Sequence, residues 1–419
     1  MSGGSELVLL TSAYPFGNAA ETFLETEIEV LAERFRRVYV LPSHREPRAR
    51  PLPANVELVE MDWFYTPSRR ARQRALVSPE ATSVFLATVR SGASLGSYLR
   101  ASRFYLDNLA RNVRKYRLLS GFVRDRGLAD AIFYDYWFEN STLALALLRE
   151  SGTIRTAVSR IHGFDLYDER WSVGTVPFRE VKARALDAIF SVSEFGREYL
   201  GKRIPKLQEK VSVQRLGVSD PGHACPAPTS ATPLVVTCAR LEAQKCVHLV
   251  PEVLARLRRP VRWVHFGDGP ERSRVAEEAS RLLNGEGQTV KWELRGQVDN
   301  REVLDFYEGN HVDALLSLSA SEGLPVSMME AQSYGVPVVA RGVGAVPEIV
   351  NEKTGVLLSP DATPPEVAAA LQKALEPGRL AVTAVRAFFQ QRFDATANYN
   401  SFVDALLALH EGMVPAGRP

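Results

Sequence analysis

Two glutamates flank the predicted start of a helix in the segment SEGLPVSMMEAQSYG, residues 321–335. The preceding run DALLSLS (313–319) predicts a buried strand, and Pro325 is typical of a first helical turn. Glu322 is therefore expected in the loop after the strand, and Glu330 two turns along the helix. N–H groups at a helix start suit an anion or hydroxyl groups, and two carboxylates can accept hydrogen bonds from vicinal hydroxyls.

Two cations and a glycine follow other predicted strands in the same half of the chain. Arg240 and Lys245 lie at and just after the end of the predicted strand LVVTCAR (234–240). Such a pair suits a diphosphate, with two ordinary surface cations as the alternative. Gly267 in HFGDGPER would let a ligand approach the backbone closely. This segment lacks the third glycine of a dinucleotide fingerprint, so no dinucleotide site is predicted.

The composition is that of a soluble globular protein with more than one domain. The chain has 419 residues, of which 45% are hydrophobic and 24% charged, and this length predicts two or three domains. A net charge of +2 predicts no nucleic-acid partner for the chain as a whole. Its three cysteines fit neither a disulfide framework nor a zinc site. We expect no signal peptide and no membrane-spanning run, which favours a cytoplasmic protein.

Strands alternate with helices on both sides of the proline-rich segment SDPGHACPAPTSATP. This alternation predicts two doubly wound, Rossmann-like α/β domains that face each other across a cleft. The predicted organisation has four parts: an N-terminal acceptor-binding domain at 1–222, a linker at 223–232, a C-terminal donor-binding domain at 233–381, and C-terminal helices at 382–419 that return to the first domain.

A basic helical insertion is predicted at about 66–127. It contains 13 Lys and Arg against 3 Asp and Glu, a net charge of +10. Within it, residues 101–122 mix basic and apolar side chains on a helical period. One interpretation is a solvated helix that packs an apolar stripe on its domain. The other is an interfacial helix that rests on anionic lipid. Nucleic-acid binding fits less well, because nothing else in the chain supports it.

In this order the motifs resemble retaining glycosyltransferases of the GT-B fold, in the large family (glycosyltransferase family 4 type) that includes glycogen and sucrose synthases and bacterial exopolysaccharide enzymes. The second half carries ARLEAQK, GDGPER, RGQV, the glutamate segment and GVGAVPEIVNEKTGVLLSP. The first half carries SAYPFGNAAETFLETEIEVL and RIHGFDLYDE. The chain departs from the family pattern at Cys246, where glycine is usual.

The resemblance implies a retaining transfer of a sugar from a nucleotide diphosphate sugar to a glycan or lipid-linked acceptor, in bacterial envelope or exopolysaccharide synthesis. The interfacial interpretation of the basic insertion would add a peripheral position on the inner face of the membrane. No cofactor is expected. No metal is expected either, since the chain has no Asp-x-Asp pair. The leaving phosphate would take the acceptor's proton on the same face of the sugar, so the glutamates would not be a hydrolase-type acid/base couple.

The resemblance also implies a role for each candidate residue. Arg240 and Lys245 would neutralise the diphosphate and the charge on the leaving group. Glu322 and His162 would contact the transferred sugar, and Glu330 would bind the ribose hydroxyls. Further donor contacts are expected from Gly17, Gly267, Gln297, Val298, Leu324, Pro325 and Val326. Acceptor contacts are expected from Glu21, Thr22, Phe23 and Asp165.

Some of these residues have a second interpretation. Glu21 and Thr22 are also typical helix-start residues, and Asp165 could orient its own loop. At the level of the whole protein, one alternative is a catalytically silent nucleotide-binding subunit of a membrane-associated assembly. Others are a nucleotide-sugar epimerase or a phosphorylase of the same fold. An epimerase should show further carboxylates and histidines, and a phosphorylase needs a pyridoxal lysine and a longer chain.

Overall fold

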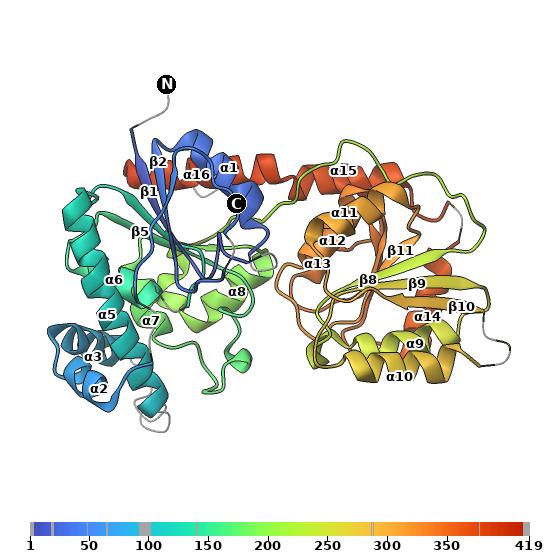
Figure 1. The fold of residues 1–419 in the computed structure, drawn as a ribbon, viewed down its shortest axis with the longest axis horizontal. Coiled ribbons are helices and arrows are strands. Elements are labelled where there is room, and N and C mark those ends of the chain that lie inside the picture. Colours follow the sequence, from blue (N-terminus) through green and yellow to red (C-terminus); the bar gives the residue numbers. More distant parts are fainter. Residues whose placement is uncertain are drawn as a thin grey trace. The chain divides into compact units, whose positions relative to one another are not determined.

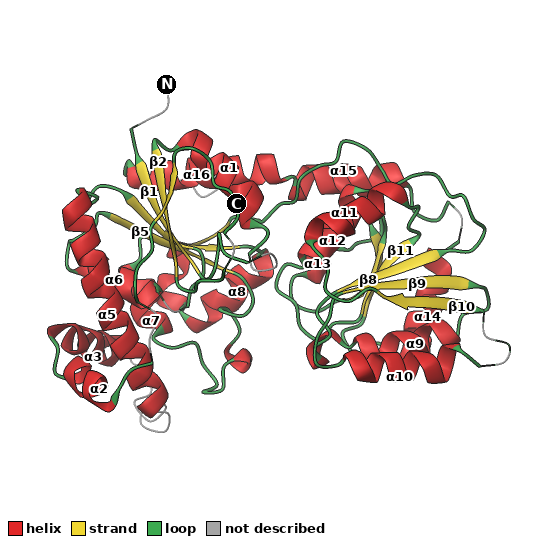
Figure 2. Ribbon diagram, viewed as in Figure 1, coloured by secondary structure: helices red, strands yellow, loops and turns green. Residues whose placement is uncertain are grey.

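The computed structural model describes residues 4–17, 21–47, 49–63, 66–91, 102–139, 141–285, 287, 289–376 and 378–413. The chain forms two compact units. The first is Met1–Gln214 together with Tyr399–Pro419, and the second is Arg215–Asn398. Each unit is a parallel sheet with helices on both faces (Figures 1 and 2). Residues 92–101 of the predicted insertion and 414–419 of the predicted C-terminal segment lie outside the described residues.

The first unit contains a seven-stranded parallel sheet of order β3-β2-β1-β4-β5-β6-β7. Its strands are β1 (Glu6–Thr11), β2 (Arg37–Pro42), β3 (Val56–Leu58), β4 (Ile132–Asp135), β5 (Thr156–Ile161), β6 (Ala188–Ser191) and β7 (Val211–Val213). The central strands are buried along their whole length. They therefore read as continuous apolar runs, as parallel strands covered on both faces do.

This unit also contains helices, most of which cover the two faces of the sheet. They are α1 (Leu24–Arg34), α2 (Arg69–Leu76), α3 (Pro79–Ser91), α5 (Ser102–Arg126), α6 (Thr142–Glu150), α7 (Arg179–Ala185), α8 (Glu194–Arg203) and α16 (Ala395–His410), with short 3-10 helices at Asp168–Arg170 and Pro205–Lys210. A buried ion pair and a neighbouring aromatic ring connect strand β5 with helices α1 and α16. Arg160 on β5 donates to Glu27 on α1 at 2.6 Å, both side chains are fully buried, and the Arg160 guanidinium lies 4.0 Å from the ring centroid of Phe402 on α16.

The second unit contains a six-stranded parallel sheet of order β10-β9-β8-β11-β12-β13. Its strands are β8 (Leu234–Cys238), β9 (Val261–Phe266), β10 (Val290–Leu294), β11 (Ala314–Ser317), β12 (Val338–Arg341) and β13 (Gly355–Leu358). Its helices are α9 (Val250–Ala255), α10 (Arg272–Leu283), α11 (Asn300–Gly309), α12 (Val326–Ser333), α13 (Val346–Ile349), α14 (Pro364–Ala374) and α15 (Val382–Phe393), with 3-10 turns at Ala243–Lys245 and Val247–Leu249. In Figure 1, α9, α10 and α14 lie on one face and α11 and α12 on the other.

Two elements are shorter than the apolar segments that contain them. The strand β7 ends at Val213, within the segment VSVQRLGV (211–218). The chain then leaves the sheet, and Gly217 packs so closely on the backbone of Ala395 that a Cβ there would overlap it. The segment HLVPEVLARL (248–257) is α-helical only over Val250–Ala255, with Pro251 in its first turn, a position that proline favours.

The predicted helical insertion is divided rather than continuous. α2 ends at Leu76, and α3 starts again after Ser78, whose hydroxyl accepts a hydrogen bond from the N–H of Ala81. Pro79 occupies the first position of α3, so Ser78 and Pro79 together form a helix-start signal. In the part of the chain that the structure describes, no helix is long and apolar enough to cross a membrane.

Candidate functional site

In the second unit, Lys245 and Glu322 form an ion pair at the carboxyl edge of the sheet. Lys245 ends the 3-10 turn after β8, and Glu322 lies in the loop after β11. Because β8 and β11 are neighbours, these two connections meet, and the N–H of Ala320 donates to the carbonyl of Gln244. The Lys245 Nζ lies 2.7 Å from Glu322 Oε1, with side chains 22% and 9% exposed.

The turn that holds Lys245 has a constrained backbone. Cys246, the next residue, has the left-handed conformation with φ 51°. A residue with a Cβ is strained there, whereas glycine is not. This explains physically why the glycine that the resemblance predicts would suit the position.

Glu330 is buried on α12 and faces a polar partner on the next helix of the same sheet face. Its Oε1 accepts a hydrogen bond of 2.7 Å from Asn300, the first residue of α11. Burial raises the pKa of the Glu330 carboxyl, and the hydrogen bond from Asn300 lowers it. Burial and then the charge of Glu330 also raise the pKa of the Cys238 thiol to about 12.

The predicted donor contacts before and at the start of α12 lie around this pair of glutamates. α12 begins at Val326 after Pro325 as N-cap, with no side-chain cap. Its first N–H groups lack intrahelical partners, as at every helix start. Leu324 is buried, and Pro325 and Val326 are half-buried.

Gly267 and Gln297 follow β9 and β10, the next two strands across the sheet. Gly267 has φ 127°, donates from its N–H to Gly296 at 2.8 Å, and is packed so that a Cβ would overlap the carbonyl oxygen of Ala239. Gln297 is exposed and donates to the carbonyl of Val298, which is half-buried. The four strands β8 to β11 thus deliver their predicted site residues to one edge of the sheet.

Arg240 adopts a more open position than its predicted partner Lys245. Its side chain is 72% exposed and its Nε lies 3.2 Å from Glu242 Oε1. The structure therefore holds Lys245 against Glu322, whereas it leaves the Arg240 guanidinium largely in solvent.

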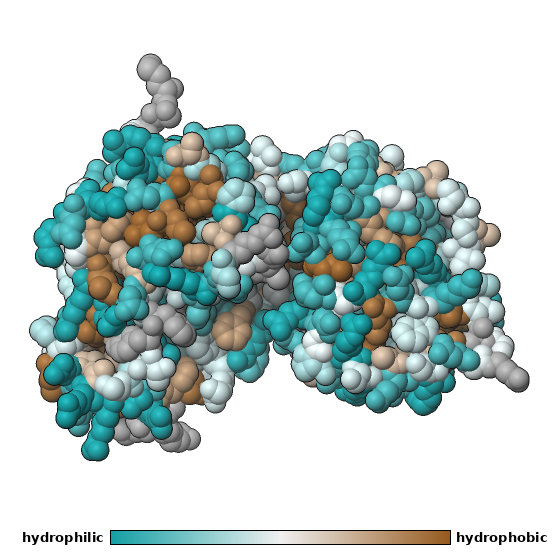
Figure 3. All heavy atoms as spheres, viewed as in Figure 1, coloured by the Kyte–Doolittle hydropathy of each residue, from teal (hydrophilic) through white to brown (hydrophobic). Residues whose placement is uncertain are grey.

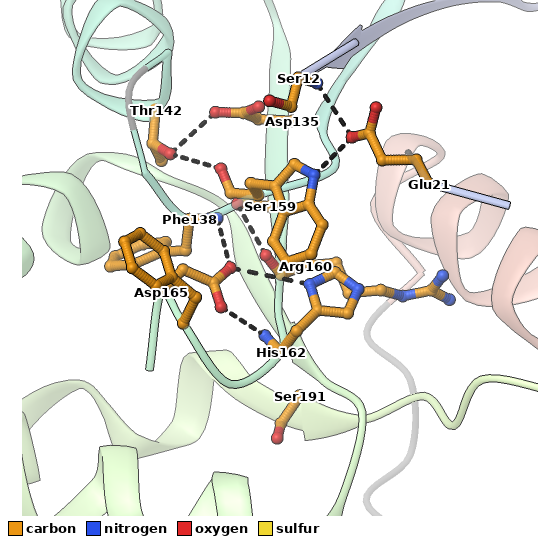
Figure 4. A network of polar contacts seen from close by, with 12 residues as sticks. Ser12, Glu21, Asp135, Phe138, Thr142, Ser159, Arg160, His162, Asp165 and Ser191 are labelled. Carbon is orange, nitrogen blue, oxygen red and sulfur yellow. Dashed lines mark hydrogen bonds and ion pairs between the residues drawn. The ribbon is translucent and has the colours of Figure 1, made fainter. Parts of the chain in front are cut away.

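In the first unit, Glu21 supports a loop rather than a helix start. The N-cap of α1 is Phe23, and Glu21 has a left-handed backbone with φ 53°. Its buried carboxylate accepts hydrogen bonds of 2.6–2.9 Å from the backbone N–H groups of Ser12, Ala13 and Tyr14 (Figure 4). It also accepts one from the indole N–H of Trp137. The helix-start interpretation is wrong for Glu21, and the geometry favours a positioning role over direct contact with an acceptor.

His162 lies directly after β5 in an aromatic surround. Its ring centroid is 4.4 Å from that of Trp137 and 4.8 Å from that of Tyr136. The residue is only 8% exposed, and neither ring nitrogen has a hydrogen-bond partner among the described residues. Its Nδ1 is 3.7 Å from Asp165 Oδ2. Buried polar atoms without such partners are uncommon, so these two nitrogens are candidates for binding a polar ligand.

Asp165 orients the loop that carries His162. It is fully buried, and its two oxygens accept hydrogen bonds from the backbone N–H groups of His162 at 2.8 Å and Phe138 at 2.9 Å (Figure 4). Both carboxylate oxygens are committed to backbone. Of the two roles predicted for Asp165, this geometry favours the orientation of its loop over contact with an acceptor.

The other predicted residues of the N-terminal loop lie near this site. The ring of Phe23 stacks on those of Tyr136 at 5.5 Å and His162 at 6.1 Å. Thr22 is half-buried. Gly17 has φ 73°, a backbone conformation that favours glycine, and a Cβ there would displace the exposed carboxylate of Glu46.

Several polar residues around the candidate site were not predicted. Asn300 and Trp137 had no distinguishing motif, although an asparagine at a helix start is a signal that could have been followed. A buried group beside β4 was also missed. There, Asp135 accepts a hydrogen bond from Thr142 at 2.8 Å, and burial raises its carboxyl pKa. Burial also lowers the pKa of Lys182, whose Nζ donates to the carbonyl of Phe138, to about 7.

The described residues contain no group of three or more His, Cys, Asp or Glu side chains that could hold a metal ion. The lack of a metal requirement stays a prediction, because a metal can also be bound through the substrate.

Comparison with known families identifies the second unit. Residues 232–377 match the family described as Glycosyl transferases group 1. They form a group 1 glycosyltransferase domain. This domain contains Lys245, Gly267, Glu322 and Glu330, and it coincides with the sheet whose edge carries the ion pair.

A curated relative extends the likeness beyond this domain. The chain is 29% identical over 235 residues to a protein of Escherichia coli (strain K12) that carries the name of a colanic acid biosynthesis glycosyltransferase, WcaL. The match covers 53% of this chain and 56% of that protein. The chain thus spans about half the length of this relative.

Solved structures show the fold of the whole chain. The apo form of the lipopolysaccharide outer core galactosyltransferase WaaB matches with a TM-score of 0.68 at 16% identity, covering 96% of this chain and 99% of that one. Anabaena HepE in complex with UDP matches with a TM-score of 0.64 at 18% identity, covering 96% and 100%. The predicted GT-B fold, with two Rossmann-like domains, is confirmed.

Replacement of Gly267 by alanine should destabilise the group 1 domain. The new Cβ meets the Ala239 carbonyl, and the backbone has a conformation that disfavours side chains, so we expect a loss of about 2–4 kcal/mol. Thermal unfolding measures the effect. Gly285→Ala is the matched control, because a Cβ there meets no atom within 4 Å. Equal stability of the two variants would contradict this account.

Replacement of Glu21 by glutamine should loosen the loop at residues 12–14. The amide offers one acceptor oxygen where the carboxylate has two, so we expect a loss of about 2 kcal/mol and a change in the fluorescence of Trp137. Urea unfolding and emission spectra measure both. Glu33→Gln, at an exposed position of α1, is the control. A Glu21→Gln variant that behaves like this control would exclude the positioning role.

Proposed function

We propose that this protein is a retaining, metal-independent glycosyltransferase that takes its sugar from a nucleotide diphosphate sugar. The acceptor is a glycan or a lipid-linked saccharide of bacterial envelope or exopolysaccharide synthesis. The protein acts in the cytoplasm, peripherally on the inner face of the membrane. The relative named for colanic acid biosynthesis and the galactosyltransferase neighbour support this class of acceptor.

The ion pair between Lys245 and Glu322 is the observation that carries the proposal. It holds a cation and a carboxylate 2.7 Å apart at the edge where doubly wound sheets bind ligands. A bound diphosphate would attract the Lys245 ammonium, and sugar hydroxyls would donate to the Glu322 carboxylate. The ion pair therefore holds the ammonium and the carboxylate in a fixed orientation at this edge.

The buried carboxylate of Glu330 extends the same site to the ribose. Its hydrogen bond from Asn300 leaves further acceptor capacity on a carboxylate, which can accept about four hydrogen bonds. The Anabaena neighbour is described in complex with UDP, which supports a nucleoside diphosphate as the donor's leaving group. Gly267 would let the backbone after β9 come close to the donor.

In the proposed reaction, the bond between the sugar's anomeric carbon and the phosphate oxygen breaks, and the acceptor oxygen bonds to that carbon from the same face. The acceptor's proton passes to the leaving phosphate. Lys245, with Arg240, stabilises the negative charge that grows on the diphosphate, the kind of electrostatic term that is often the largest in catalysis. His162, whose ring nitrogens lack hydrogen-bond partners among the described residues, would bind a hydroxyl of the transferred sugar.

Two variants separate this proposal from a catalytically silent nucleotide-binding subunit. Glu322→Gln should lower the rate of transfer by about a hundredfold and change nucleotide affinity little, because Glu322 contacts the sugar. Lys245→Gln should weaken binding of the nucleoside diphosphate by about tenfold or more. Glu277→Gln, at an exposed position of α10, is the control. Transfer that survives Glu322→Gln at the wild-type rate would refute the assigned role.

Retention and metal independence are tested on the unaltered protein. We expect the product to keep the anomeric configuration of the donor, as read from its NMR coupling constants, and the rate to be the same with and without EDTA. An inverted product would contradict the same-face reaction. A rate abolished by EDTA and restored by a divalent cation would show that the cations of the chain do not replace a metal.

A further inference from the structure

Part of the first unit exposes apolar side chains beside exposed cations. We call it the α2–α3 surface. Its residues are Arg69, Arg70, Arg74, Leu76, Val77, Phe85, Leu86 and Val89. In Figure 1, α2 and α3 lie together at the end of this unit, at the lower left, and in Figure 3 this region shows hydrophobic residues among hydrophilic ones.

The helix α3 is apolar on two sides. Ala81, Val84 and Ala87 are buried in a core cluster with α5 and α7. On the outward side, Phe85, Leu86 and Val89 are 57%, 47% and 49% exposed. Val89 lies four residues after Phe85 and three after Leu86, so its side chain neighbours both of them on the helix surface. A helix that faces water normally has a polar outer side, so this second apolar side indicates a partner.

The helix α2 adds positive charge and two more apolar side chains. Arg72 pairs with Asp107 at 2.5 Å and so fastens α2 to α5. Arg69, Arg70 and Arg74 are exposed and form no ion pair or hydrogen bond with the described residues. At the end of α2, Leu76 is 50% and Val77 85% exposed.

The helix for which the sequence suggested lipid contact does not expose its apolar side chains. Of the two interpretations of residues 101–122, the structure supports the helix that packs an apolar stripe on its domain. Tyr105, Leu109 and Val113 of α5 are buried in the same cluster as α3, and Leu119 is buried in the main core. The apolar stripe of α5 is thus covered by protein, and the basic insertion exposes its apolar groups on α2 and α3 instead.

We infer that the α2–α3 surface binds an anionic lipid bilayer. Phe85, Leu86 and Val89 would enter the boundary between head groups and acyl chains, and the arginines of α2 would contact anionic head groups. The charges favour a membrane over a protein partner. Glu80, the one acidic residue of α2 and α3, is paired with Arg117 and its side chain is only 13% exposed. This inference adds a membrane-binding surface to the proposed function, in which the acceptor is lipid-linked. It rests on the proposed function only for the reason why the protein would bind a membrane.

Flotation of the full chain with vesicles tests the surface. We expect binding to vesicles that contain phosphatidylglycerol, weaker binding at high salt, and little binding to phosphatidylcholine alone. Arg70→Gln with Arg74→Gln should reduce partitioning by roughly thirtyfold, since each basic residue contributes about a factor of five. Phe85→Ser with Leu86→Ser should reduce it by about tenfold or more.

Matched controls keep the result specific to this surface. Lys202→Gln with Lys206→Gln removes two exposed cations elsewhere in the first unit, and Leu357→Ser removes an exposed apolar side chain of the second unit. Both should float like the unaltered protein. Nucleoside diphosphate binding measured without vesicles should be unchanged in all variants, which separates this inference from the proposed function.

Three outcomes would overturn the inference. The protein could stay in the aqueous fraction with phosphatidylglycerol at low salt. The Phe85→Ser, Leu86→Ser variant could float like the unaltered protein. Gel filtration could show a dimer that this variant abolishes, with no vesicle binding, which would assign the surface to a second copy of the chain.

Discussion

The parallel sheet of the second unit is the constraint on which the candidate site depends. All its strands run the same way, so every connection after a carboxyl end leaves from one edge. The connections after β8, β9, β10 and β11 carry Lys245, Gly267, Gln297 and Glu322, residues up to 77 apart along the chain. The fold thus assembles a charged, Gly-lined edge from segments that have no local reason to meet.

In each unit an ion pair joins segments that lie far apart in the sequence. In the second unit, Lys245 and Glu322 pair with 22% and 9% of their side chains exposed, so the diphosphate and the sugar hydroxyls of the proposed donor would replace the two partners. In the first unit, the pair of Glu27 and Arg160 is fully buried and stabilises the contact of α1 with β5 and α16. A buried pair of this kind is costly to break, because the remaining charge loses its partner. An ion pair that is partly accessible can thus give way to a ligand, whereas one that is fully buried holds segments of the fold together.

The sequence was sufficient to predict both doubly wound domains and the placement of Glu322, Glu330 and Lys245 at strand ends and on α12. These depend on periodicity and on the geometry of parallel sheets, which are local or general. The roles of Glu21, Asn300 and Trp137 depend on contacts between distant segments and could not be predicted. The basic insertion shows the same limit. The positive charge of the insertion is evident in the sequence. That α5 buries its apolar stripe while α3 leaves a second apolar side exposed is decided by tertiary packing.

The central claim is that the second unit holds a nucleoside diphosphate without a metal. Calorimetric titration with UDP, GDP, ADP, TDP and CDP in the presence of EDTA tests it most directly. The account predicts that one of these nucleotides binds clearly. At a hundredfold excess over its dissociation constant, that nucleotide should raise the free energy of unfolding by about 2.7 kcal/mol. Absence of binding by all five, with the protein folded, would contradict it.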